Sequence, residues 1–412
     1  MNETGIAWTD FTWNVWSGCK KKSSACAHCY AETFAENKRG TVGFPHGFDL
    51  TVRPHKLAEP RKTLKSAGPA LIFVGSMTDI GLDDDELKPD EIDRMCAAGF
   101  ESMDRLRDAV FEVIEATPEH RYQLVTKRPR VLLQYLVTRR LPRNAWVLVT
   151  VENAHEAEMR LPVLREIKER FFYPQNVAGV SIEPLLDAQL ARSPAMIAAA
   201  TWLDWMIIGG ESGVHFAEAR NAGRFLVERI GHCKRCDTTW SHGDGCPECG
   251  LDRATTTLAP KLPALAAVRA LLELRRGPDV LARAEEAVRA AGFQGLAGGV
   301  HDTSVRSIHR SLLSHVGGTM RTRAAADAIR AVEACLVPTF FKQWGGPRPD
   351  SGGREVDGRT YDEMPTVPRA LPERRVALGA ATAGLARKLR ETRSCCIACS
   401  ARCARWCERI RA

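Results

Sequence analysis

Long uncharged apolar runs are missing from this sequence. The most apolar stretch, residues 185–210, is interrupted by Asp187, Arg192 and Asp204. This pattern excludes a transmembrane helix and predicts no membrane partner. The first ten residues, MNETGIAWTD, also lack the basic and apolar regions of a secretory signal. Because no segment for membrane insertion or export is visible, we expect a cytoplasmic protein.

Cysteine, in contrast, is abundant. A reducing cytoplasm disfavours disulfides, so the fourteen cysteines need another explanation, such as metal binding or catalysis. Twelve of them fall into three clusters, while Cys96 and Cys335 stand alone and are expected to be small buried hydrophobic residues. The three clusters are therefore candidate metal sites.

The first cluster lacks an obvious fourth ligand. Cys19, Cys26 and Cys29 follow a C-x6-C-x2-C pattern, whereas a structural zinc site takes four protein ligands. His28 lies between two of the cysteines, where its position is awkward for completing a zinc site with them. The alternative is a 4Fe-4S cluster held by three thiolates, with its fourth iron open to a cofactor or substrate. The spacing alone leaves both interpretations open.

The second cluster has the pattern of a zinc ribbon. Two C-x2-C pairs are separated by nine residues, and together they give four thiolates for a tetrahedral zinc site. Such a site either contacts nucleic acid or protein, or stabilises its own segment. The predicted zinc ligands are Cys233, Cys236, Cys246 and Cys249.

The third cluster lies in a basic tail, residues 369–412, which contains eleven Lys/Arg and three acids. This tail is either a solvated helix or a segment that contacts phosphates. Its cysteines recur every four residues and would form a stripe on a helix, which either holds an auxiliary iron-sulfur cluster or zinc, or packs as a small-residue face. The candidates are Cys395, Cys399, Cys403 and Cys407, with Cys396 beside them.

Short apolar, β-branched runs recur between residues 70 and 212, separated by helix-like stretches. This alternation predicts parallel strands joined by crossover helices. Strands that are apolar almost throughout indicate a sheet covered on its faces, so we expect an α/β fold, either a full or partial (β/α) barrel or a doubly wound sheet. The predicted strands are LIFVGS (71–76), YQLVTK (122–127), WVLVTVEN (146–153), VAGVSIEP (177–184) and WMIIGGES (205–212).

Polar residues stand at or just after the ends of these predicted strands. In parallel α/β folds the carboxyl ends of the strands surround the ligand site. A single carboxylate there would more commonly cap the next helix. Polar residues at the ends of five successive strands instead favour a ligand-binding site. The candidate binding residues are Ser76, Asp79, Lys127, Glu152, Glu183 and Glu211.

The pattern changes after this region, which suggests four segments. Residues 1–221 form the β/α core, and 222–334 read as an insertion that contains the zinc ribbon (233–249) and Ala/Arg/Leu-rich helices. The strand-like LVPTFFKQWGG begins a return to the core over 335–368, and 369–412 is the basic cysteine-rich tail, expected to be helical.

Eight motifs together resemble a known family. TGIAWTDFTWNVWSGCKKKSSACAHCYAE, FVGSMTD, TKRP, VTVEN, SIEPLL, GGESG, FFKQWG and DGRTYDEMP are similar, in order, to phage-associated radical-SAM-like proteins distantly similar to spore photoproduct lyase. The resemblance covers about residues 3–221 and 335–365, and it implies a partial (β/α) barrel of radical SAM type. The first gap departs from the superfamily's usual C-x3-C-x2-C spacing.

The resemblance also implies cofactors and roles. Cys19, Cys26 and Cys29 would hold a 4Fe-4S cluster, with S-adenosyl-L-methionine on the open iron and an electron donor such as flavodoxin or ferredoxin. Ser76 and Asp79 would recognise the amino group of S-adenosylmethionine. The remaining strand-end residues would contact that cofactor or the substrate, and no catalytic residue is assigned.

The combination of a radical generator, a zinc ribbon and a basic tail predicts a nucleic-acid substrate whose base is flipped out of the stack. The specific hypothesis is an isomerase that converts N-linked to C-linked glycinyl-thymine in phage DNA hypermodification, acting in the host cytoplasm. The alternatives are a radical SAM lyase that repairs DNA lesions, and a non-enzymatic zinc protein that binds DNA or protein. Aromatic residues near the first cluster either stack a base or pack in the core: Trp8, Trp13, Trp16 and Tyr30.

Overall fold

The computed structural model divides the described chain into two compact units. The first contains Met1–Val147 and Phe171–Asn176, and the second contains Leu148–Arg170 and the described part of Val177–Thr366. The predicted boundary between residues 221 and 222 and the tail 369–412 lie outside the described residues. The structure describes residues 1–212, 227–232, 239–240, 255–274, 284, 286, 288–290, 328–329, 331–332, 335–345 and 351–365.

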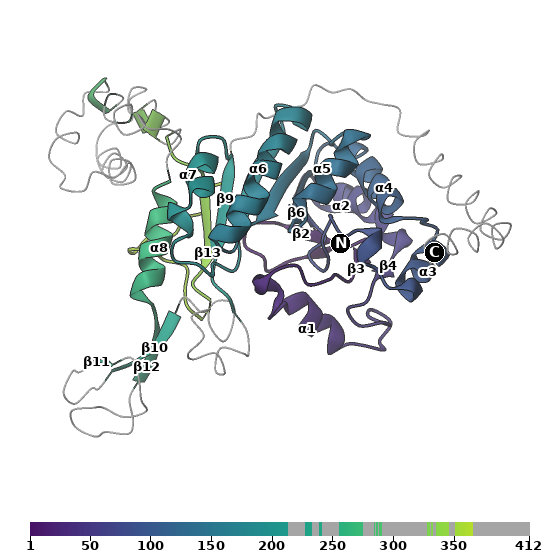
Figure 1. Cartoon of the computed structure of the whole chain (residues 1–412), viewed down its shortest axis with the longest axis horizontal. Coiled ribbons are helices and arrows are strands. Elements are labelled where there is room, and N and C mark those ends of the chain that lie inside the picture. The colour runs from purple at the N-terminus through teal and green to yellow at the C-terminus, as the bar shows by residue number, and fades with distance from the viewer. Residues whose placement is uncertain are drawn as a thin grey trace. The chain divides into compact units, whose positions relative to one another are not determined.

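The main sheet has eight strands (Figure 1). In hydrogen-bonded order they are β1 (Asn2–Glu3), β2 (Phe11–Trp13), β5 (Leu71–Val74), β6 (Arg121–Thr126), β7 (Ala145–Thr150), β8 (Val177–Ile182), β9 (Trp205–Gly209) and β13 (Thr339–Gln343). Strand β1 is antiparallel to β2, whereas β2–β5, β5–β6, β8–β9 and β9–β13 are parallel pairs. This mixed α/β architecture is consistent with the predicted partial (β/α) barrel.

All five apolar runs form strands in this sheet, which confirms the predicted alternation. Every residue of β7, β8 and β9 is buried, as expected for strands covered on both faces. The strand-like stretch 336–346 contains β13, which pairs with β9 in the same sheet. The sequence analysis did not predict β1 and β2, which are two and three residues long.

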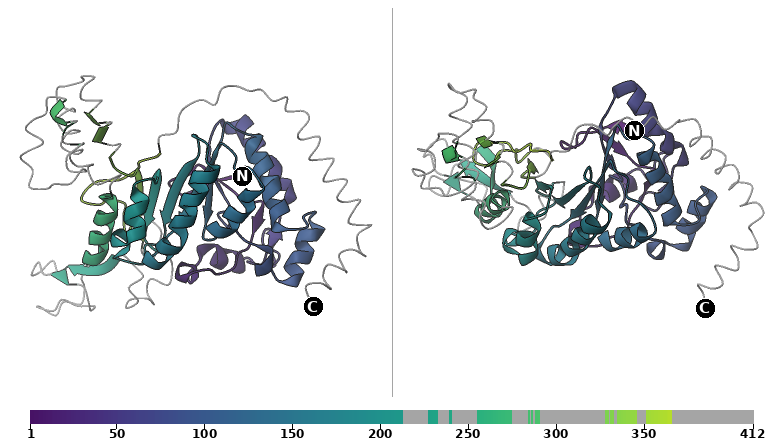
Figure 2. Two further views of the ribbon diagram at one scale, coloured as in Figure 1. Left: turned by 45° about the horizontal axis from the view of Figure 1, so that its top comes forward. Right: turned by 90° about the horizontal axis from the view of Figure 1, so that it is seen from above.

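Helices alternate with the strands (Figures 1 and 2). Helix α4 buries one face that includes Leu106, Val110 and Ile114, and its N-cap Ser102 accepts a hydrogen bond from the amide of Arg105. The α-helices are α1 (Tyr30–Glu36), α2 (Glu59–Ala67), α3 (Pro89–Ala97), α4 (Met103–Glu115), α5 (Pro129–Val137), α6 (Ala154–Phe171), α7 (Pro194–Ala200) and α8 (Leu262–Leu272). The short 3-10 helices are η1 (Ser24–Cys26), η2 (Pro54–Ala58), η3 (Asp84–Glu86) and η4 (Leu190–Arg192).

Two smaller sheets accompany the main one. Strands β3 (Trp16–Ser17) and β4 (Thr51–Val52) form an antiparallel pair in the first unit. In the second unit, β10 (Val227–His232) lies between β11 (Thr239–Trp240) and β12 (Thr255–Pro260). The four predicted zinc ligands fall in the sequence between these three strands, outside the described residues, so the zinc ribbon stays a prediction.

The ends of β9 and β13 approach each other closely in the second unit. The amide of Gly210 donates to the carbonyl of Gln343 over 2.9 Å, and a Cβ atom at position 210 would lie 2.0 Å from the carbonyl oxygen of Trp344. A Cβ atom at Gly345, where φ is +85°, would lie 2.1 Å from the carbonyl oxygen of Glu211. Gly210 of the GGES motif and Gly345 of the QWGG motif are therefore required by backbone contact.

None of the helices in the described part of the chain combines the length and apolar character that a bilayer crossing requires.

Candidate functional site

The cysteine loop begins directly after the small β3–β4 sheet. Gly18 has a φ of +103°, and a Cβ atom there would lie 2.7 Å from the amide nitrogen of Leu50, so only glycine fits this turn. Its amide donates to the carbonyl of Met77, and its carbonyl accepts from the hydroxyl of Thr78. These bonds connect the start of the loop to the segment that follows β5.

The three cysteines of this loop are half-buried free thiols. Cys26 ends η1, and its sulfur accepts a hydrogen bond from the amide of Lys22 over 3.5 Å. Burial, followed by the negative charge of Asp79, raises the pKa of the Cys19 thiol to about 12, although Arg128 acts in the opposite direction. Burial also raises the pKa of Cys29. Cys26 contributes to both shifts, so it lies within electrostatic range of the other two cysteines.

These thiols share one loop without forming a closed coordination shell. In the described ranges, no group of three or more His, Cys, Asp and Glu side chains is arranged to hold a metal ion. Binding of a cluster would therefore have to draw the three sulfurs together, in the way that metal binding is coupled to local folding. The assignment of Cys19, Cys26 and Cys29 as cluster ligands stays a prediction.

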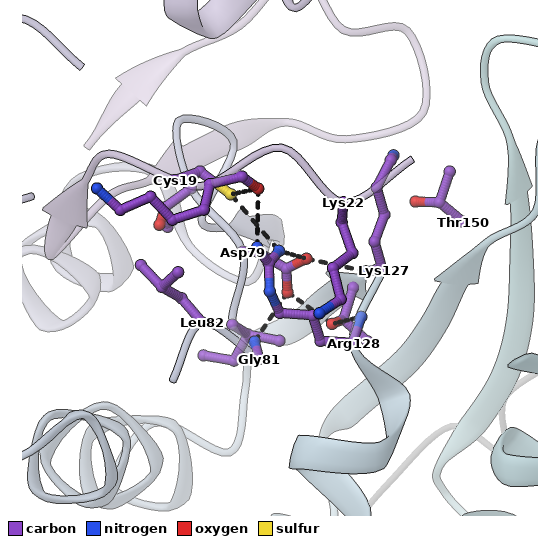
Figure 3. Close-up of polar contacts among 12 residues, drawn as sticks. Cys19, Lys22, Asp79, Gly81, Leu82, Lys127, Arg128 and Thr150 are labelled. Carbon is purple, nitrogen blue, oxygen red and sulfur yellow. Dashed lines mark hydrogen bonds and ion pairs between the residues drawn. The ribbon is translucent and has the colours of Figure 1, made fainter. Parts of the chain in front are cut away.

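Arg128 lies beside the first cysteine, and its side chain is 1% exposed. Its guanidinium forms a bidentate ion pair with Glu86, over 2.6 and 3.0 Å, and donates to a carboxylate oxygen of Asp79 over 3.0 Å. It also donates to the carbonyl of Lys20 over 2.7 Å and to the sulfur of Cys19 over 3.6 Å (Figure 3). One buried cation thus connects the cysteine loop to two carboxylates.

The local sequence explains where this arginine lies. Proline is favoured at the first position of a helix, where its missing N–H is not needed, and Pro129 begins α5. The residue before proline is disfavoured in helical conformation, so the chain turns between the end of β6 and α5. The amide of Arg128 donates to the hydroxyl of Thr126 in this turn, over 2.8 Å. The TKRP motif therefore forms the turn between β6 and α5.

Asp79 is a buried anchor of the same network. One carboxylate oxygen accepts from the amide of Gly81 and the hydroxyl of Thr126, over 2.8 and 2.6 Å. The other accepts from the amide of Lys127 and the guanidinium of Arg128, over 2.9 and 3.0 Å. Asp79 therefore lies at the carboxyl end of the strands as predicted, but its oxygens already hold the turn after β6.

Ser76 and Lys127 lie close to this network. The hydroxyl of Ser76 accepts from the side-chain amide nitrogen of Asn14 over 2.9 Å, and the backbone carbonyl of Ser76 accepts from the hydroxyl of Tyr30. Lys127 contributes its backbone amide to Asp79, and no ion pair of its ammonium group occurs within the described residues. Both side chains are half-buried. The first unit therefore brings together Cys19, Ser76, Asp79 and Lys127.

A second buried carboxylate supports the loop. Glu91, in α3, is fully buried and accepts from the ammonium group of Lys20 over 2.6 and 2.8 Å. Its oxygens also accept from the amides of Leu50 and Lys88, over 2.7 and 2.8 Å. The lysine that follows Cys19 is thus fixed at its side chain by Glu91 and at its carbonyl by Arg128.

The predicted aromatic residues divide into two groups. Trp8, Trp13 and Trp16 are at most 4% exposed and belong to the core, so base stacking by these three residues does not fit the structure. Tyr30 is 59% exposed at the start of α1, directly after Cys29, and Phe34 is 45% exposed one turn later. Side chains four positions apart on a helix share a face, so these two rings lie on one side of α1.

The other candidate residues belong to the second unit. Glu152 is fully buried and pairs with Arg160 of α6 over 2.8 Å, so its carboxylate supports the helix in this structure. Glu183 pairs with Lys342 of β13 over 2.9 Å, and it also accepts from the hydroxyl of Ser181. Glu211 is buried in the contact between the ends of β9 and β13.

Sequence reasoning missed two cations of these networks. Arg128 is not among the candidate residues named from the sequence, although an arginine between a buried strand and a helix-starting proline is a usable signal. Lys342 interrupts the apolar strand TFFKQ, and this interruption suggests that it faces a carboxylate.

Comparison with protein families assigns the chain to one of them. The chain belongs to the family described as "Protein of unknown function (DUF5131)", whose model matches residues 3–242. The matched range includes the cysteine loop, Asp79 and Arg128. No curated protein and no solved structure matches the chain.

Proposed function

We propose that this protein is a radical S-adenosylmethionine enzyme that acts on a nucleic-acid base. The observation that carries the proposal is the cysteine loop itself. Three free, half-buried thiols occur within eleven residues, and the first of them contacts a buried arginine that is fixed at the carboxyl ends of β5 and β6. Ligand sites of parallel α/β folds occupy this position.

The donor set fits an iron-sulfur cluster. Such clusters are held by cysteine thiolates, and Cys19, Cys26 and Cys29 would provide three of them. If these three residues held a 4Fe-4S cluster, the cluster together with S-adenosylmethionine would supply a 5′-deoxyadenosyl radical. Flavodoxin or ferredoxin would be a suitable electron donor.

The chain's own residues would orient and enclose these groups. Gly18 and Thr78 hold the loop against the segment after β5, and Arg128 fixes the backbone at Lys20. Ser76 and Lys127 lie half-buried near this loop, with a hydroxyl and an ammonium group for polar parts of the cofactor. Because the Asp79 oxygens are engaged by four donors, we assign Asp79 a supporting role.

A nucleic-acid substrate is supported by the surface next to Cys29. Tyr30 and Phe34 expose two rings on one face of α1, and the ammonium group of Lys38 lies 4.0 Å from the centre of the Phe34 ring. Residues 17–44 contain five Lys/Arg and two acids, so this surface segment is basic. Exposed rings and cations are the features with which proteins bind single-stranded nucleic acids.

The most specific form of the proposal is the isomerase of thymidine hypermodification in phage DNA. Abstraction of hydrogen from a glycyl α-carbon suits a deoxyadenosyl radical, because the resulting carbon radical is stabilised by its flanking groups. The product would carry the glycine through its α-carbon instead of its nitrogen. This assignment rests on the resemblance described above and is open to a direct substrate test.

The proposal is tested by anaerobic reconstitution of the full chain with iron and sulfide. We expect a visible iron-sulfur absorption band, bound iron, and release of 5′-deoxyadenosine after reduction in the presence of S-adenosylmethionine. A colourless protein that contains zinc but no iron and does not cleave the cofactor would contradict the proposal, and would favour a non-enzymatic zinc protein.

The substrate is tested with two DNA probes. The isomerase hypothesis predicts turnover of DNA that contains N-linked glycinyl-thymine and none of irradiated DNA. The opposite result would identify a repair lyase and would leave the radical SAM assignment intact.

Replacement of Tyr30 by alanine should weaken binding of single-stranded DNA about tenfold, because stacking of one base on an aromatic ring contributes about 1–3 kcal/mol. Fluorescence anisotropy with a labelled oligothymidine measures this change. Tyr30→Phe keeps the ring and should bind nearly as well as the wild type. Ile197→Ala removes an apolar side chain of similar exposure, 54%, from α7 and should have no effect. Equal affinities for Tyr30→Ala and Ile197→Ala would show that α1 is not the binding surface.

A further inference from the structure

We infer that Arg128 is a positioning residue that fixes Cys19 as a cluster ligand and raises the reduction potential of the cluster. This inference rests on the proposed function, because it concerns the cluster that the cysteine loop would hold. It assigns a role to a residue that none of the sequence patterns marked as part of a site.

The guanidinium of Arg128 is deeply buried. Only 1% of the Arg128 side chain is exposed, and burial of a cation is costly unless its donors are paired. The charge of Arg128 is balanced by Glu86 and Asp79, both within 3.0 Å. Burial of this charged side chain beside Cys19 costs free energy, and a residue that only joined two surface loops would not need to be buried.

The N–H donors of Arg128 are held in fixed directions. Glu86 holds Nε and Nη2 in a bidentate pair, and Asp79 accepts from Nη1, so the plane of the guanidinium is fixed. In this orientation Nη1 also points to the sulfur of Cys19, at 3.6 Å, and Nη2 to the carbonyl of Lys20, at 2.7 Å. Arg128 thus fixes both the sulfur of the first cysteine and the backbone directly after it (Figure 3).

The positive charge of Arg128 would favour the reduced form of a cluster bound at Cys19. A bound thiolate carries negative charge, and a reduced cluster carries more of it than an oxidised one. A cationic donor at the sulfur therefore stabilises the reduced form more than the oxidised form. Hydrogen bonds to sulfur and local net charge are among the features that set iron-sulfur potentials. Loss of the Arg128 donor should shift the potential to more negative values and make the one-electron reduction harder.

The test compares Arg128→Gln and Arg128→Lys with Arg130→Gln as the matched control. Arg130 is exposed in the first turn of α5, two positions after Arg128, so its replacement removes one positive charge without touching the network. Each full-length variant is reconstituted anaerobically, and the midpoint potential of the cluster is measured by a redox titration followed by visible absorption.

For Arg128→Gln we expect a reduction equilibrium at least about tenfold less favourable, which corresponds to a shift of about 59 mV to more negative potential. Arg128→Lys keeps the charge without the forked donors and should lie between Gln and wild type. Arg130→Gln should match the wild type. An Arg128→Gln protein that binds the cluster at the wild-type potential would overturn the inference.

The milder variant Glu86→Gln covers the case in which Arg128→Gln does not fold. Glu86 is partly exposed, and its loss frees two guanidinium donors while Asp79 still holds the third. The change also removes a negative charge near the cluster, while Asp79 and the carbonyl of Lys20 still orient the guanidinium. We therefore expect a smaller shift in the opposite direction, to more positive potential, and no shift or a more negative one would contradict the inference. If wild-type protein binds no iron-sulfur cluster at all, the proposed function itself fails, and this inference fails with it.

Discussion

A Cys26→Ala variant reconstituted with iron and sulfide should lose most of its bound iron and should release no 5′-deoxyadenosine. Cys26 raises the pKa of both Cys19 and Cys29, so it lies within electrostatic range of the other two thiols. A 4Fe-4S cluster with one open iron uses all three thiolates, and two thiolates would hold it poorly. The measurements are iron per chain, the visible absorption band, and chromatography of the nucleoside products.

Cys96→Ala is the matched control for this prediction. Cys96 is a half-buried cysteine of α3 that belongs to none of the three clusters. Its replacement should leave the iron content and cofactor cleavage at wild-type values. If Cys26→Ala retained its iron while Cys96→Ala lost it, the C-x6-C-x2-C triplet would not be the ligand set.

Replacement of Gly210 by alanine should destabilise the protein by about 3 kcal/mol, the upper part of the usual range for overpacking. A Cβ atom at this position would lie 2.0 Å from the carbonyl oxygen and 2.5 Å from the carbonyl carbon of Trp344. Both are backbone atoms of the segment after β13, so no side-chain rotation relieves the clash. The ends of β9 and β13 would have to separate, and the hydrogen bond from Gly210 to Gln343 would break.

Chemical denaturation followed by circular dichroism measures this effect. Gly5→Ala is the control, because a Cβ atom at position 5 would have no neighbour within 4 Å. Gly5→Ala should change the free energy of unfolding by no more than about 0.5 kcal/mol, the usual range of surface substitutions. Equal midpoints for the two variants would show that the contact between β9 and β13 is looser than described.

The sequence predicted the parallel sheet well because its strands are mostly apolar, and β7, β8 and β9 are buried throughout. The runs 71–76, 146–153 and 205–212 are apolar on both faces, and this property is visible without knowledge of any partner strand. Strand β2 was missed, because its three residues, FTW, carry no periodicity and form a strand through their pairing with β5. Short strands are specified by their neighbours more than by their own residues.

The candidate site was predicted less completely. Strand-end reasoning placed Asp79 correctly at the edge of the sheet, but a carboxylate that anchors a turn has the same sequence pattern as one that binds a ligand. Glu152 shows the same ambiguity. The sequence does not reveal whether its carboxylate binds a ligand or pairs with Arg160, which lies eight residues later in α6. Arg128 and Arg130 carry the same charge, and in the sequence they differ in that Arg128 stands between a buried strand and Pro129; the fold buries Arg128 and exposes Arg130.

The pairing of β13 with β9 has a consequence for synthesis of the chain. Met206 of β9 pairs with Thr339 of β13, so one edge of β9 is without this partner until well over a hundred further residues have left the ribosome. Closure of so long a loop is entropically costly and slow, and an open strand edge invites pairing with other chains. Helix α8, which contacts η4 within the same unit, is made before β13. Nascent chains that stop between α8 and β13 should therefore be the most aggregation-prone intermediates of this protein.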